Sequence, residues 1–149
     1  MSESFKSPGD HYELAERLEA SRLLLNGEKL QAFACCCCRL IWKQLPPEAQ
    51  EALKVGEEFS RGLVPSERIV AERIKLWDLV GEESCNFSST KVNAVRAVIC
   101  CLSEYSDSDL EVAYDHVRTS MDFCNAVEDH QREQYDLLVE IFAENAVAG

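Results

Sequence analysis

Leu30-Gln-Ala-Phe-Ala-Cys-Cys-Cys-Cys-Arg-Leu-Ile-Trp42 is the stretch that decides the fold of this chain. Projected at about 100° per residue, it forms a helix that is apolar nearly all round, and only Arg39 and Lys43, beside Ala32 and Cys36, mark a solvent sector. The expected buried stripe consists of Leu30, Phe33, Ala34, Cys37, Ile41 and Leu45, flanked by Cys35, Cys38 and Trp42. A helix this apolar is predicted to be the central one, contacted by several neighbours.

Capping residues, glycines and prolines punctuate the rest of the chain and predict further helices around this one. The predicted helices span about residues 10–25, 28–45, 48–60, 66–80, 90–105 and 106–143. Ser89 or Thr90 is expected to cap the fifth helix, and Ser106 with Asp109 to form a capping box at the start of the sixth.

The last predicted helix contains a discontinuity. Glu128 and Gln131 interrupt its apolar stripe, so a kink or a break is expected near Asn125. Residues 81–90 form the main predicted loop, and residues 1–9 and 145–149 are expected to be flexible. No window alternates apolar and polar residues like a half-buried strand. The whole chain, 1–149, is therefore predicted to be one all-α domain, a bundle of about six antiparallel helices with a central Cys-rich helix.

Composition places the chain among soluble globular proteins, because 46% of its residues are hydrophobic and 28% are charged. No apolar stretch is long enough to cross a bilayer, and the N-terminus lacks the apolar segment of a signal peptide. A cytoplasmic location is expected. Cysteines stay reduced there, so the eight cysteines do not indicate a disulfide framework.

The net charge of −12 is distributed unevenly. Residues 1–75 contain 12 acids and 11 bases, whereas residues 76–149 contain 15 acids and four bases. This field repels phosphates, which disfavours nucleic acid and anionic membranes as partners and favours a basic or amphipathic protein. An acidic surface that only keeps the protein soluble is the simpler alternative. The candidate interaction residues are Asp107, Asp109, Glu111, Asp115, Asp122 and Asp129.

A metal-binding or thiol-redox sensor centred on the Cys35–Cys38 run is the alternative function. Cys35 and Cys38 share a helix face at workable ligand spacing. The further candidate ligands are Cys100, Cys101, Cys124, His116 and His130. Structural zinc sites usually contain a second pair of closely spaced ligands on a turn, and this sequence has no such pair. Isolated histidines on a polar helix are typically solvated. The favoured interpretation is therefore that the cysteines are small buried hydrophobic residues. Cys36 and Cys85 are the thiols expected to be exposed for redox chemistry.

Catalytic motifs are not evident. The chain contains no Gly-rich phosphate loop, no G-x-S-x-G elbow and no H-E-x-x-H, so neither an enzyme nor a cofactor is predicted. A helical homo-oligomer stays open as a third reading, because Trp77 and the Leu23–Leu25 cluster could form an exposed apolar patch.

The segment Leu30–Trp42 resembles the L-x-x-F-A-C-x-C-C-R-x-x-W segment of an uncharacterised family of bacterial all-helical proteins. Val55–Gly62 is similar to that family's V-A-E-R-F/Y-A-D-G, and Gln134–Phe142 to its Q-x-D-L-L-R-D-I-F. The chain departs from the pattern at Val139, where the family has arginine. The resemblance implies a helical fold and transfers no activity, cofactor or site residue.

Overall fold

The computed structural model describes residues 16, 26–103, 105 and 107–148, without the side chains of residues 107 and 142–148. Within these residues the chain is all-α, as predicted, and contains no strand. The helices are α2 (Gly27–Arg39), α3 (Pro47–Ser60), α4 (Ser66–Val80), α5 (Thr90–Cys101), α6 (Leu110–Val127) and α7 (Gln131–Ala148). Single 3₁₀ turns occur at Trp42–Gln44, Gly81–Glu83 and Asp107–Asp109.

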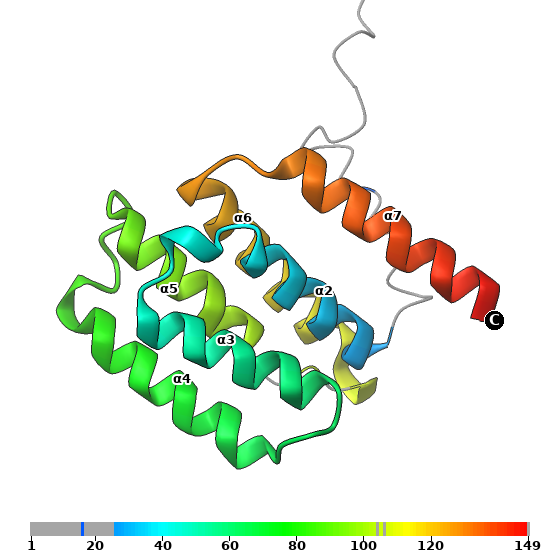
Figure 1. Cartoon of the computed structure of the whole chain (residues 1–149), viewed down its shortest axis with the longest axis horizontal. Helices are drawn as coiled ribbons and strands as arrows, with labels where there is room; N and C mark the ends of the chain where they lie inside the picture. The colour runs from blue at the N-terminus through cyan, green and yellow to red at the C-terminus, as the bar shows by residue number, and fades with distance from the viewer. Residues whose placement is uncertain (1–15, 17–25, 104, 106, 149) are drawn as a thin grey trace, which may run out of the picture.

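The Cys-rich helix α2 is the centre of the bundle, as the sequence predicts. It contacts α3, α5, α6 and α7, and Figure 1 shows it in the middle, with α3 and α4 on one side and α7 on the other. Consecutive helices run antiparallel. The bundle is completed by α5, which packs on both α4 and α6.

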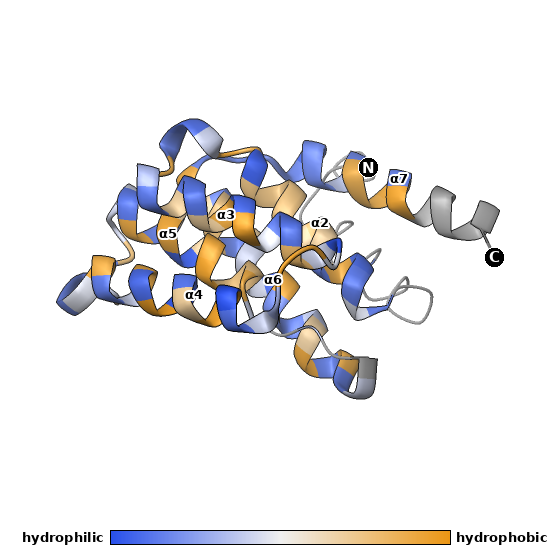
Figure 2. Cartoon of the chain, turned by 60° about the horizontal axis from the view of Figure 1, so that its bottom comes forward, coloured by the Kyte–Doolittle hydropathy of each residue, from blue (hydrophilic) through white to orange (hydrophobic). Residues whose placement is uncertain are grey.

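The core is built around the predicted stripe of α2. Phe33, Cys37 and Ile41 are completely buried, as are Leu30 and Ala34. Burying one side chain the size of Phe33 stabilises the fold by about 1.5–3 kcal/mol. In Figure 2 apolar and hydrophilic residues alternate along the helices, as expected for helices that each bury one face.

The structure corrects the predicted end of this helix, which stops at Arg39 rather than Leu45. Leu40 and Ile41 donate to carbonyls three residues back, over 3.1 Å each, so the last turn tightens and a 3₁₀ turn follows at Trp42–Gln44. Pro46 ends the 3₁₀ turn that follows, because a proline pushes the residue before it out of the helical region. Leu45 is accordingly extended, with φ −79° and ψ 133°.

The predicted N-terminal caps are half right. Ser89 caps α5, its Oγ accepting the Val92 N–H over 3.1 Å. Asp109, predicted as the third residue of a capping box, is itself the N-cap of α6 and accepts the Val112 N–H over 3.4 Å. The 3₁₀ turn at Asp107–Asp109 shifts the helix start, and the placement of Ser106 lies outside the described residues.

The break predicted near Asn125 is present three residues later. Glu128 is extended, with φ −160° and ψ 136°, and separates α6 from α7. The α7 backbone is helical through Ala148, although the sequence assigns 145–149 to a flexible tail. The first predicted helix and residues 1–9 lie outside the described residues. No helix in the described part combines the length and the apolar character needed to span a membrane.

Candidate functional site

Buried thiols from three helices meet at the centre of the bundle. The Cys35 thiol on α2 donates to the Cys101 sulfur at the end of α5, with the sulfurs 3.9 Å apart. Cys38 lies 3.6 Å from the Ser120 hydroxyl of α6. That hydroxyl also donates to the Ala97 carbonyl over 2.9 Å. Hydrogen bonds with the Cys101 and Cys124 thiols lower the pKa of Cys38 well below its ordinary value.

All eight thiols are free, and they differ sharply in exposure. Cys36 and Cys85 are exposed, as predicted, whereas Cys37 and Cys124 are buried. Burial raises the pKa of Cys37 well above its ordinary value, and burial raises the pKa of Cys100 to about 12. An apolar environment disfavours the thiolate, so Cys37 and Cys100 act as small hydrophobic residues in the resting protein.

The candidate metal ligands do not all meet at one place. Cys35, Cys38 and Cys124 lie in the core, while Cys100 lies at its margin. His116 packs its ring against Tyr105 instead, with the centroids 5.7 Å apart, and burial lowers its pKa. Within the described part of the chain, no three histidine, cysteine or acidic side chains are placed to share one metal ion.

Gln31 ties α2 to the end of α5 and was missed by the sequence reasoning. Its side chain is buried, and its Nε2 donates to the carbonyls of Cys101 at 3.0 Å and Ser103 at 3.2 Å. Carbonyls at a helix C-terminus lack helical partners, so Gln31 supplies the donors that they need. The available signal was a polar residue next to the buried Leu30 on an otherwise apolar helix.

Carboxylates form a row along the outer face of α6, which we name the acidic stripe: Glu111, Asp115 and Asp122, all exposed. Spacings of four and seven residues keep them within one narrow sector of the helix. Arg118 is the base in this sector and lies over the Tyr114 ring at 5.8 Å. Neither Asp115 nor Asp122 takes part in an ion pair with the described residues.

The other predicted interaction residues do not belong to the acidic stripe. Asp109 is occupied as the N-cap of α6. Asp129 lies between α6 and α7 and accepts the Gln131 N–H over 3.0 Å. The side chain of Asp107 lies outside the described residues. Two of the six candidate interaction residues, Asp109 and Asp129, therefore have local roles at helix starts.

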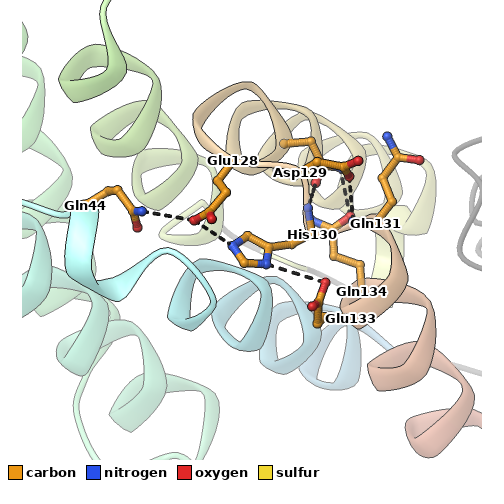
Figure 3. Close-up of polar contacts among 8 residues, drawn as sticks. Gln44, Glu128, Asp129, His130, Gln131, Glu133 and Gln134 are labelled. Atoms are coloured by element: carbon orange, nitrogen blue, oxygen red, sulfur yellow. Dashed lines mark hydrogen bonds and ion pairs between the residues drawn. The ribbon is translucent and has the colours of Figure 1, made fainter.

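His130, expected to be solvated, is largely enclosed at the corner between α6 and α7 (Figure 3). Only 16% of its side chain is exposed, and its ring nitrogens lie 3.3 Å from Glu128 and 3.5 Å from Glu133. Its backbone N–H donates to Asn125 Oδ1 over 2.9 Å, and Gln44 donates to Glu128 over 3.0 Å. The enclosure follows from the tight corner, which folds α7 back over α2 and brings these side chains together.

An arginine surrounded by aromatic rings lies where α4, α5 and α6 meet. The Arg96 guanidinium carbon is 4.9 Å from the Phe123 ring, 5.0 Å from Trp77 and 5.7 Å from Phe87. Its Nη1 donates to the Ser84 carbonyl over 2.8 Å. Trp77 is 41% exposed, but the arginine covers one face of it. Trp77 was expected to form an exposed apolar patch with the Leu23–Leu25 cluster, which lies outside the described residues.

A pocket of about 350 Å³ opens beside Gln31 and Tyr105. Three of its polar side chains are already engaged: Gln31 binds the Cys101 carbonyl, Tyr105 donates to the Cys100 carbonyl over 3.0 Å, and Ser60 donates to the Glu57 carbonyl over 2.8 Å. Glu28 is the other polar side chain of its lining. Ligand pockets usually contain a few convergent polar groups that remain available. This pocket therefore has little with which to orient a small molecule.

Comparison with known proteins adds no relative: no family model, no curated protein and no solved structure matches the chain. The resemblance of Leu30–Trp42 to a bacterial family thus stays a prediction.

Proposed function

We propose that this protein is a non-enzymatic interaction module that binds a basic protein partner through the acidic stripe of α6. The observation that carries the proposal is the row of exposed carboxylates, of which Asp115 and Asp122 have no cationic partner among the described residues. A cationic partner could pair with each of these two aspartates.

The stripe also has a length suited to a helical partner. Glu111 and Asp122 are separated by 11 residues, or about 16 Å along the helix axis. Val112, 45% exposed, lies beside the row and offers an apolar contact to an amphipathic helix. A partner with lysines at matching spacings would place one ammonium near each carboxylate. The charge of the whole second half, 15 acids against four bases, would steer such a partner toward the protein.

The test uses a synthetic amphipathic peptide with lysines at positions i, i+4 and i+11, and a second peptide of the same composition in scrambled order. The Asp115→Asn, Asp122→Asn variant is compared with Glu51→Gln, Asp78→Asn, which removes the same charge from exposed positions on α3 and α4. Exposed ion pairs contribute about 0.2–1 kcal/mol each. Losing two should therefore raise the Kd about 2- to 30-fold.

Only the stripe variant should lose affinity, and the wild type should prefer the ordered peptide. Binding should also weaken as salt rises from about 0.1 M to about 1 M, since the screening length falls from about 10 Å to about 3 Å. Equal Kd values for the two variants would show that the acidic surface acts only through its total charge. That result would leave solubility as the role of these carboxylates.

A further inference from the structure

Two cysteines far apart in sequence lie in contact across the central helix packing. Cys35 and Cys101 are separated by 66 positions, yet their sulfurs are 3.9 Å apart. A disulfide requires about 2.05 Å, so the sulfurs need to approach by about 1.9 Å in total. Side-chain rotation together with a small shift between α2 and α5 can supply such a movement. We propose that Cys35 and Cys101 are a peroxide-sensitive pair that forms a reversible disulfide linking α2 to α5.

On the third side, the backbone of α3 approaches the pair closely. Gly56 of α3 faces both sulfurs, and a Cβ built there would lie 3.6 Å from Cys35 Sγ, 4.0 Å from Cys101 Sγ and 3.0 Å from Leu102 Cδ2. Glycine is unfavourable in the middle of a helix, and Gly56 lies inside α3. Because Gly56 has no side chain, the backbone of α3 packs against the pair without an atom that would hold the sulfurs in place.

The surroundings favour a disulfide over a thiolate centre. Cys35 is 2% exposed and Cys101 is completely buried. The polar groups in contact with Cys101 are the Cys35 and Cys38 thiols and the Gln31 amide, which binds the backbone carbonyl. A metal bound by two thiolates would leave net charge in this apolar site unless it were divalent, and no third ligand is placed for it among the described residues. A disulfide is neutral, so burying it carries no such penalty.

The oxidant is hydrogen peroxide, which is small enough to enter a packed core when α2 and α5 separate briefly. The Cys35 sulfur attacks one peroxide oxygen, the O–O bond breaks, and the products are a sulfenic acid and one water. The Cys101 sulfur then attacks the Cys35 sulfur, the S–O bond breaks, and the departing hydroxide leaves as water with the Cys101 proton. Two thiols lose two hydrogens and two electrons, and one peroxide is reduced to two waters.

The pair differs from the exposed thiols in what oxidation does. Cys36 and Cys85 lie at the surface, where oxidation would link separate molecules. Cys38 is the competing partner inside the core, because it interacts with the Cys101 and Cys124 thiols as well as with Ser120. The inference does not depend on the acidic stripe, and neither result of the peptide experiment bears on it.

The experiment treats the Cys36→Ser, Cys85→Ser chain with hydrogen peroxide, counts thiols, and maps linked peptides by mass spectrometry. The expected result is a monomer that has lost two thiols, with one peptide pair containing Cys35 and Cys101 that dithiothreitol separates. Its thermal midpoint should rise by several degrees on oxidation. Because this chain keeps both Cys35 and Cys101, the result does not depend on whether a variant at either position folds.

Three results would overturn the proposal. These are a link from Cys38 to Cys101 or Cys124, oxidation of Cys35 to a sulfinic acid without any crosslink, and retention of both thiols after prolonged exposure. As a matched control, Cys101→Ala should abolish the crosslink, and circular dichroism reports whether that chain stays folded. A crosslink of unchanged yield in the Cys101→Ala chain would likewise exclude the assigned pair.

Discussion

Gln31→Met isolates the contribution of the buried amide that joins α2 to the end of α5. Methionine has nearly the same length and keeps the packing, but it cannot donate to the carbonyls of Cys101 and Ser103. Each lost hydrogen bond costs about 0.5–1.5 kcal/mol, and a buried acceptor left without a donor can cost about 1–3 kcal/mol. The free energy of unfolding should therefore fall by about 2–4 kcal/mol.

Urea unfolding followed by far-UV circular dichroism measures this change, provided that the slope with urea stays constant. The matched control is Gln50→Met, which removes a single half-buried bond to the Trp42 carbonyl, 3.0 Å long, and should cost about 1 kcal/mol. If Gln31→Met stayed within about 0.5 kcal/mol of the wild type at an unchanged slope, water would be replacing the amide. The reasoning that Gln31 holds the two helices together would then be refuted.

Three further outcomes follow from the same contacts. Closing the 66-residue separation between Cys35 and Cys101 should stabilise the oxidised chain by about 4 kcal/mol in urea unfolding without reductant, and an unchanged midpoint would contradict a native-state link. Burial raises the pKa of Cys100 from 9.0 to about 12, so this thiol ionises at lower pH in the unfolded chain than in the folded one. The stability that the neutral Cys100 thiol contributes should therefore be lost as pH rises from 9 to about 12. In a plot of unfolding free energy against pH, Cys100→Ala should flatten that part of the curve. Asn125→Ala removes the acceptor of the His130 N–H and the hydrogen bond to Gln134. It should lower the free energy of unfolding by about 2 kcal/mol in thermal unfolding. An unchanged stability would show that α7 is held by its apolar face alone.

The part of the candidate site that could be predicted from sequence is the part set by one helix. The exposed row Glu111, Asp115 and Asp122 follows from spacing alone, and so does the exposure of Cys36. Asp109 could not be assigned correctly, because whether it caps the helix or follows the cap depends on a single turn of backbone. His130 was placed wrongly for a related reason, since its enclosure depends on how sharply α7 turns back at Glu128.

The sequence by itself determined the helical class, the centrality of α2 and the break between α6 and α7. These features depend on periodicity, on Pro46 and on polar residues that interrupt an apolar stripe, all of which act over a few residues. Only the tertiary structure decided that Cys35 meets Cys101 and that Gln31 binds the end of α5, because those pairs join positions about 70 apart. Such contacts depend on the angle and register at which packed helices cross, which local propensity does not encode.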